Sequence, residues 1–259
     1  NTPSPAMTKA LLMTSARYMK GIGANDNLPS KSQGMGTMDL SSAFSTDARI
    51  LRDQLPEDTL TATGQTRRFT GVISNPSQPF RVTLAYTDAP GSTTSSAWNN
   101  NLDLTVISGG REYKGNVFVG GWSQTGGTAD HRNNVESVFL PAGASGPFAI
   151  IVTAQNINSD GVPNWGGSLD QDFALVVTNA QAIDTPVPTT AGFTIANEGC
   201  SPANASADPE EQVIIDFGLR NVGTRETTDL VATLEASGGI THLTTSMSYG
   251  VIHNTGEPV

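Results

Sequence analysis

The sequence predicts a mainly β protein whose largest part is an antiparallel β-sandwich of jelly-roll type. Its composition favours this fold class, because charged residues make up only 15% of the 259 residues while 27 Gly and 15 Pro supply turns. From about Thr61 onward, apolar and polar residues alternate with the period of a β-strand. Turn-forming clusters such as Asn75-Pro76 separate the alternating segments, which indicates short strands joined by polar loops.

One strong helix precedes the sandwich. We expect it over residues 4–20, with Ser4 as the N-cap and Pro5 at the first helical position. Most of its circumference is apolar, so it needs a large neighbour to cover it. A loop-like segment and a short helix near residues 39–44 follow. For the long helix the sequence leaves three alternatives open, namely docking on the sandwich, pairing with another copy, or disorder.

Alternation predicts six strands in the sandwich and three beyond it. The sandwich strands are expected at residues 66–74, 80–87, 101–107, 135–140, 148–154 and 172–178. The later strands are expected at residues 192–197, 212–221 and 229–236, in a tail that we interpret as a truncated immunoglobulin-like module. The predicted regions are a short helical N-terminal remnant (1–60), the sandwich (61–182), a stiff Pro/Thr linker (183–190) and the partial module (191–259).

Charge and cysteine content exclude several classes of protein. The net charge is −10, and no basic stripe is present, which argues against binding to nucleic acid. The single Cys200 rules out an intrachain disulfide and a four-thiolate zinc site. No apolar run approaches the length needed to span a membrane. Because the chain begins at Asn1 without a signal peptide, we expect it to be part of a longer protein.

No residue of this chain is predicted to be catalytic. A Ser-His-Asp triad needs a histidine placed beside a serine on a strained turn, and neither Gly-x-Ser-x-Gly nor Gly-Thr-Ser occurs. We interpret His131, His242 and His253 as turn residues, and Cys200 as an incidental thiol. The segment GGWSQTGG lacks the lysine that a phosphate-binding loop requires.

Three oxygen-rich loops could bind calcium, which takes six to eight oxygen ligands from carboxylates, amides and carbonyls. The loops are TDAPG at residues 87–91, WNNNLDL at 98–104 and TADHRNNVE at 128–136. The candidate ligands are Asp88, Asn100, Asn101, Asp103, Asp130, Asn133, Asn134 and Glu136. The alternative is that these residues cap turns of the loop backbone, and spacing alone favours that alternative.

The segment NTPSPAMTKALLMTSARYM…QGMGTMDLSSAF at residues 1–44 resembles the last part of a subtilisin-like catalytic domain. In that family, a similar helix follows shortly after the helix that bears the catalytic serine. The resemblance implies that the serine, histidine and aspartate lie upstream and are missing from this chain. The chain would then be the C-terminal part of a bacterial serine endopeptidase.

Residues 66–179 resemble the β-sandwich that follows the catalytic domain in large alkaline subtilases, akin to the P domain of kexin-like convertases. The matching motifs, in order, are LAYTDAPGS, NNNLDLTV, REYKGN, RNNVESVFL and DFALVVTN. The family's sandwich can bind calcium, so the resemblance implies a structural calcium ion here. The family often has Asn-Asp-Leu-Asp-Leu where this chain has Asn101 in place of the first aspartate, which makes Asp88, Asp103 and Glu136 the firmer candidates.

The resemblance implies a non-catalytic, extracellular module that stabilises the missing catalytic domain or helps to bind a protein substrate. The tail at residues 208–236 is similar to adhesion-type immunoglobulin-like modules, which implies a spacer or binding role. Two other hypotheses remain open. The chain could be a binding or adhesion module for carbohydrate or a cell surface, with Trp98, Trp122 and Trp165 stacking on sugars, or it could be a calcium-stabilised spacer only.

Overall fold

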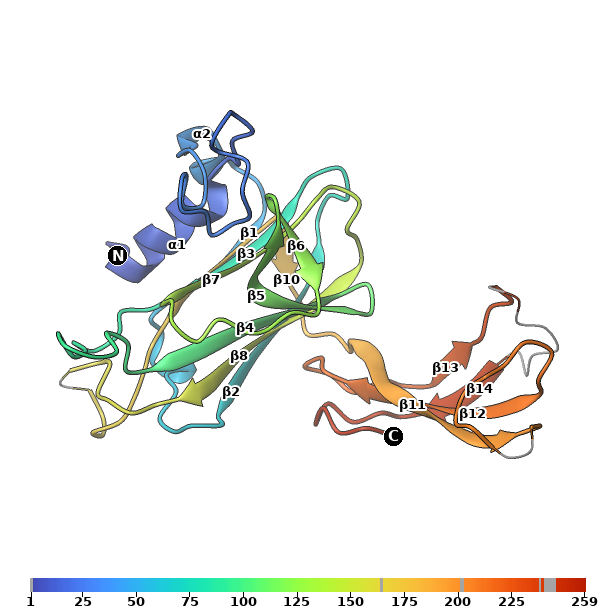
Figure 1. Ribbon diagram of the computed structural model, residues 1–259. Helices are drawn as coiled ribbons and strands as arrows, with labels where there is room; N and C mark the ends of the chain where they lie inside the picture. Colours follow the sequence, from blue (N-terminus) through green and yellow to red (C-terminus); the bar gives the residue numbers. More distant parts are fainter. Residues whose placement is uncertain (1, 164, 201–202, 238, 240–245) are drawn as a thin grey trace. The chain divides into compact units, whose positions relative to one another are not determined.

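A computed structural model describes residues 2–163, 165–200, 203–237, 239 and 246–259 (Figure 1). The chain divides into two compact units, Asn1–Ile183 and Asp184–Val259. Each unit is built mainly from antiparallel strands, so the predicted fold class is confirmed. No helix among the described residues is long and apolar enough to cross a membrane.

The first unit carries three short helical segments and ten strands among its described residues. The helical segments are α1 (Pro5–Ser15), α2 (Leu40–Ala43) and a 3-10 turn, η1 (Pro56–Asp58). The strands are β1 (Arg49–Asp53), β2 (Thr66–Ile73), β3 (Phe80–Ala85), β4 (Asn101–Ser108), β5 (Arg111–Val119), β6 (Trp122–Thr125), β7 (Val135–Leu140), β8 (Pro147–Asn156), β9 (Ala174–Thr178) and β10 (Ala180–Ala182).

Two sheets face each other in this unit. One has the strand order β1-β9-β3-β7, and the other has the order β10-β2-β8-β4-β5-β6. Most connections cross from one sheet to the other, as in a jelly roll. The core lies between the sheets, and its largest fully buried side chains include Phe80, Leu84 and Leu175 from the smaller sheet and Leu102, Phe148 and Ile150 from the larger one.

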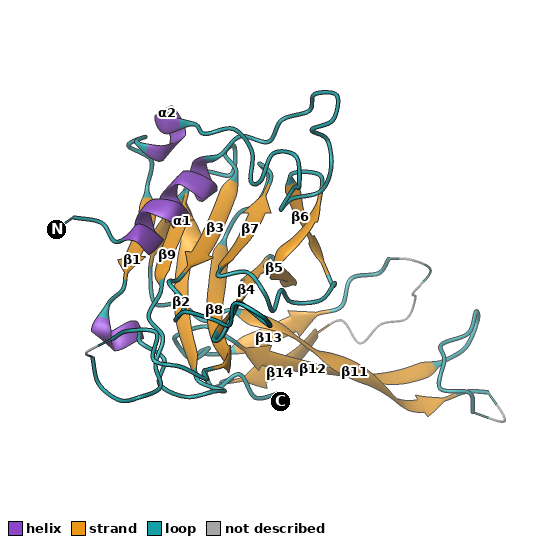
Figure 2. Cartoon of the chain, turned by 60° about the vertical axis from the view of Figure 1, so that its left-hand side comes forward, coloured by secondary structure: helices purple, strands orange, loops and turns teal. Residues whose placement is uncertain are grey.

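Helix α1 docks on the outer face of the four-stranded sheet (Figure 2). Its start follows the sequence prediction, because the Ser4 hydroxyl accepts the Met7 N–H at 2.9 Å and proline occupies the first turn. Ala6, Met7 and Ala10 are buried in a cluster with apolar residues of β3, β7 and β9. Of the three alternatives left open for the helix, the structure therefore shows docking on the sandwich.

The helix ends at Ser15 rather than continuing to residue 20. The guanidinium of Arg81, on β3, donates to the backbone oxygens of Thr14 at 3.1 Å and Ala16 at 2.6 Å. Arg17 then pairs its backbone with Thr37 in both directions at 2.9 Å. These partners replace helical hydrogen bonds, so the predicted extension of the helix is wrong.

The sandwich begins before residue 61. Strand β1 pairs with β9 along its whole length, from Arg49 opposite Thr178 to Asp53 opposite Ala174. The region 1–60 therefore contributes an edge strand as well as helices. All six sandwich strands expected from alternation are present, with ends that differ by at most two residues, whereas β1, β5, β6 and β10 were not expected from alternation.

The second unit contains β11 (Pro188–Glu198), β12 (Val213–Asn221), β13 (Leu230–Thr233) and β14 (Ser246–Gly250) among its described residues. They form two two-stranded antiparallel sheets, β11-β12 and β13-β14. The linker is shorter than the predicted range of residues 183–190. Strand β11 starts at Pro188, and the buried Val187 already donates its N–H to Asn221 Oδ1 at 2.9 Å. Asn221 also binds the Ile252 oxygen, which ties the end of the chain to this turn.

Replacing Arg81 with alanine should lower the free energy of unfolding by about 2 kcal/mol, because two charge-assisted hydrogen bonds to α1 are lost. The stacking of its guanidinium on Phe139, 4.6 Å from the ring centroid, is lost as well. Urea unfolding of the whole chain measures the change, with Arg111→Ala on the exposed start of β5 as the control. Equal midpoints for the two variants would contradict this role of Arg81.

Candidate cation site

The oxygen-rich loops predicted from the sequence lie near the ends of β3, β4 and β7, and the structure divides their residues into two groups. Asp88, Asn100 and Asn134 are engaged in hydrogen bonds that hold loops together. Asn101, Asp103 and Asp130 lie near the buried carboxylate of Glu136 and form the second group with it. Asn133 belongs to this group through its contact with Asp130.

Asp88 closes the loop between β3 and β4. Its two carboxylate oxygens accept the backbone N–H groups of Asn99 at 2.7 Å and Asn100 at 3.0 Å. This arrangement is the turn-capping alternative considered for these residues.

Asn100 is buried and connects the loop before β4 to the loop between β8 and β9. Its amide nitrogen donates to the oxygens of Ser159, Asp170 and Gln171. Its amide oxygen accepts the N–H groups of Asn158 at 2.8 Å and Ser159 at 3.1 Å. With its amide oxygen so occupied, Asn100 is suited to a structural role rather than to metal ligation.

Asn134 links α1 to the sandwich. Its amide oxygen accepts a hydrogen bond from Lys9 Nζ at 2.9 Å, and its amide nitrogen donates to the Tyr86 oxygen at 2.8 Å. Both ends of this side chain are therefore used in positioning the helix.

Glu136 is the centre of the second group. It lies on β7, is fully buried, and points between the two sheets, where Oε2 accepts the Leu104 N–H at 2.7 Å. Strand β5 pairs with β4 only from Thr105 onward, which leaves the Leu104 N–H available to this carboxylate. Glu136 Oε1 is buried without a hydrogen-bond partner.

Asn101 and Asp103 lie on β4, and both are buried. The Asn101 amide nitrogen donates to Asp103 Oδ1 at 3.0 Å, while Asn101 Oδ1 is buried without a partner. Burial is the main cause that raises the pKa of Asp103, and the negative charge of Asp130 adds to it. Asn101 thus contributes a second unsatisfied oxygen beside an acidic group.

Asp130 lies in the loop before β7 and is the member of this group whose ionised form is stabilised. Oδ1 accepts the Arg132 N–H at 2.9 Å, and Oδ2 accepts the Asn116 amide at 2.9 Å. Burial would raise the pKa of Asp130, but hydrogen bonds from Asn133 and Asn116 outweigh it and hold the pKa below its usual value. Asp130 therefore remains ionised beside its two acidic neighbours.

Burial raises the pKa of Glu136 to about 9, against the hydrogen bond from Leu104, and the charges of Asp103 and Asp130 raise it further. A buried carboxylate without a positive partner is stable only if it takes up a proton or a cation. At neutral pH this group therefore binds a proton when no cation is present. The unsatisfied oxygens of Glu136 and Asn101, with the carboxylates of Asp103 and Asp130, are of the type that calcium prefers.

Gly115 and Asn116, the last two residues of the REYKGN motif, form the wall of this group. A Cβ atom on Gly115 would lie 2.1 Å from Glu136 Oε2, so only glycine fits there. Asn116 has a φ of 59°, and its amide bonds the Val135 oxygen at 2.8 Å and the Ser137 N–H at 3.0 Å. The side-chain amide covers part of the free edge of β7. The Gly-Asn pair was the available signal, because glycine allows a close approach of another group and asparagine tolerates a positive φ.

Among the described residues, three His, Cys, Asp or Glu ligand atoms lie within 4.8 Å of one another only in Glu198, Cys200 and Glu211 of the second unit. The carboxylate oxygens around Glu136 are spaced more widely than this. Cys200 lies beside both glutamates, and the hydrogen bond to Glu211 is the main cause that raises its pKa to about 11. Its thiol is therefore poorly suited to thiolate chemistry.

The histidines of the described chain contact aromatic or acidic groups. His131 makes an edge contact with Trp98, with ring centroids 6.2 Å apart, and His253 Nδ1 lies 2.6 Å from Glu226. His242 lies outside the described residues.

The tryptophans differ in their surroundings. Trp122 lines a hollow of about 420 Å³ with Tyr113 and Arg111, and the Arg81 guanidinium stacks 5.6 Å from its ring. Trp165 is exposed on the loop between β8 and β9, whereas Trp98 is half-buried.

No protein family matches the chain, and no curated protein is significantly similar to it.

The pKa of Glu136 gives stability a defined pH dependence when a chelator removes divalent cations. Its pKa of about 9 in the folded chain lies above the ordinary value of 4.5, so the folded state retains a proton that the unfolded state releases. The retained proton on Glu136 makes its full contribution to the free energy of unfolding below about pH 4.5. That contribution falls as pH rises towards 9, by up to about 1.4 kcal/mol per pH unit.

Glu136→Gln should remove this slope, and in chelator at pH 8 it should unfold at a higher temperature than the wild type. Thermal melts between pH 5 and pH 9 measure the difference, with Glu235→Gln, an exposed glutamate, as the control. A Glu136→Gln melting profile parallel to that of the wild type would contradict this assignment.

Proposed function

We propose that this chain is a non-catalytic, accessory part of an extracellular, subtilisin-like serine endopeptidase. Its N-terminal layer, residues 2–48, docks on the catalytic domain, and its sandwich is stabilised by calcium at the Glu136 group. The partner is the catalytic domain, which supplies the serine, histidine and aspartate for peptide-bond hydrolysis. The observation that carries this proposal is the apolar surface left open on the N-terminal layer.

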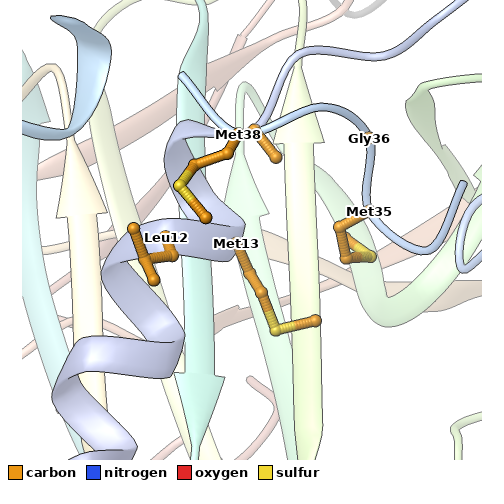
Figure 3. A pocket seen from close by; sticks show the side chains of 6 residues that line it. Leu12, Met13, Met35, Gly36 and Met38 are labelled. Carbon is orange, nitrogen blue, oxygen red and sulfur yellow. The ribbon is translucent and has the colours of Figure 1, made fainter. Parts of the chain in front are cut away.

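A hollow of about 180 Å³ lies between α1 and the segment that follows it (Figure 3). Its lining is apolar and rich in methionine, from Leu12 and Met13 on the helix and from Met35 and Met38 on the later loop. Methionine side chains adapt to irregular partner surfaces and are common at binding interfaces.

Large apolar side chains near this hollow in sequence are exposed to solvent. Phe44 is 73% exposed and Met38 is 62% exposed, and Ile22 is fully exposed. Leu40 and Met19 are also exposed. These five exposed side chains all fall within residues 19–44, and exposed apolar groups that form one patch are typical of an interaction surface. This stretch is the one that resembles the end of a subtilisin-like catalytic domain, which supports that domain as the partner.

The sandwich contributes support rather than chemistry in this proposal. Lys9, through Asn134, connects α1 to the loop that carries Asp130 and leads into β7, where Glu136 lies. Calcium bound by that loop would therefore stabilise the base on which the N-terminal layer rests. A carbohydrate-binding module is the weaker alternative, because the Arg81 guanidinium covers a face of Trp122 on which a sugar ring would stack.

The docking surface can be tested with the two parts made separately. The coding sequence upstream should encode a domain with a Gly-Thr-Ser-type nucleophile motif, and that domain should bind this chain added in trans. The double variant Ile22→Ser, Phe44→Ser should bind at least about ten-fold more weakly, because apolar contact area is lost. Val231→Ser, exposed in the second unit, is the control. An upstream sequence without the nucleophile motif, or equal binding by both variants, would refute the proposal.

The calcium site is tested by melting the whole chain in millimolar calcium and in chelator. Calcium at 100 times its dissociation constant should stabilise the wild type by about 2.7 kcal/mol, which raises the melting temperature by several degrees. Asp103→Asn should reduce this shift, whereas Asp229→Asn, an exposed control, should not. Identical wild-type curves in calcium and chelator would rule out the site.

A further inference from the structure

A second acidic group lies in the loop between β8 and β9, and neither of its two central residues, Asp160 and Asp170, was predicted as a ligand. Asp160 and Asp170 form a parallel bridge across the loop. The Val162 N–H donates to Oδ1 of Asp160 at 3.1 Å and to Oδ1 of Asp170 at 2.9 Å. One amide hydrogen thus holds two carboxylates side by side.

Asp170 is fully buried, and its Oδ2 atom has no hydrogen-bond partner. In the part of the chain that the structure describes, neither Asp160 nor Asp170 forms an ion pair with lysine, arginine or histidine. Burial raises the pKa of Asp170, and the nearby Asp160 adds to the shift. The pair therefore has an unsatisfied buried oxygen and uncompensated negative charge.

Further acids increase the negative potential at this place. Asp172 is buried next to it, and the charges of Asp170 and Asp53 add to burial in raising the pKa of Asp172. Asp172 Oδ1 and Asp53 Oδ1 are also buried without partners. A positive ion near Asp170 would relieve repulsion among all of these groups.

Buried contacts of Gln171 and Asn100 fix the backbone of this loop. The carboxylates of Asp160 and Asp170 therefore cannot move apart without breaking those contacts. Gln171 is fully buried and donates to the Thr87 oxygen at 3.0 Å. A Cβ atom on Gly161 would lie 2.4 Å from Gln171 Oε1, so the loop backbone packs directly on this side chain. Asn100 also donates to the Asp170 backbone oxygen at 3.2 Å.

We propose that Asp160 and Asp170 bind a divalent calcium ion in this loop, at a site separate from the Glu136 group. Asp170 Oδ2 and the Asp160 carboxylate supply the protein charge, and backbone oxygens and water complete the coordination, as calcium's irregular geometry allows. An all-oxygen donor set of this kind does not suit zinc or copper. The site fixes the long β8–β9 loop and does not depend on the proposed peptidase partner.

Terbium luminescence tests the site, because Tb³⁺ substitutes for calcium and is excited by a nearby tryptophan. Trp165 belongs to the same loop, where its backbone N–H donates to the Val162 backbone oxygen at 3.1 Å. The whole wild-type chain should give Tb³⁺ emission that calcium displaces. Trp165→Phe should lose most of the emission from this site while keeping its affinity for calcium in calorimetry.

Asp160→Asn and Asp170→Asn should each weaken cation binding at this site at least ten-fold, while Asp229→Asn should leave it unchanged. Glu136→Gln should abolish only the other site, so the two proposals fail separately. Asp160 is half-buried, so Asp160→Asn tests the proposal even if Asp170→Asn does not fold. Emission and calcium affinity that are unchanged in both Asp160→Asn and Asp170→Asn would overturn it.

Discussion

The burial of Glu136 between the two sheets is the constraint on which the sandwich depends. Its carboxylate satisfies the Leu104 N–H of the opposite sheet, so it joins the sheets by a hydrogen bond as well as by apolar packing. The wall beside it accepts no side chain at Gly115. Asn116, with its positive φ, then uses its amide to complete the edge of β7. The buried carboxylate of Glu136 therefore restricts the residue types that fit at positions 115 and 116.

The same carboxylate is costly to bury, and the cost must be offset locally. Glu136 Oε1 and Asn101 Oδ1 have no partner, and Asp103 and Asp130 add negative charge rather than positive. Below the Glu136 pKa of about 9 a proton offsets this cost, and a bound divalent cation would offset it in place of that proton.

Much of the fold could be predicted from the sequence, because apolar and polar residues alternate over parts of the strands and the helix has a clear N-terminal signal. The Ser4-Pro5 start of α1 and all six expected sandwich strands are observed. The C-terminal end of α1 was not predictable, since Arg81 and Thr37 act on it from distant segments. Strands β1 and β10 are too short to show alternation, and they become strands only by pairing with β9 and β2.

The candidate site was predictable only in part. Residue type identified Asp103, Asp130 and Glu136, but it could not separate them from Asp88, which caps a turn in the same kind of loop. The Asp160–Asp170 pair was missed, because the two residues are ten positions apart and meet only when the loop folds back on Gln171.

The central claim is that the Glu136 group binds calcium. A crystal structure of the whole chain, from crystals grown in the presence of calcium, would test it most directly. The claim predicts electron density for an ion about 2.3–2.6 Å from Glu136 Oε1, with oxygens of Asp103 or Asp130 among its other ligands. It would be contradicted by an empty site in which Glu136 Oε1 is hydrogen-bonded to a protein group or to water instead.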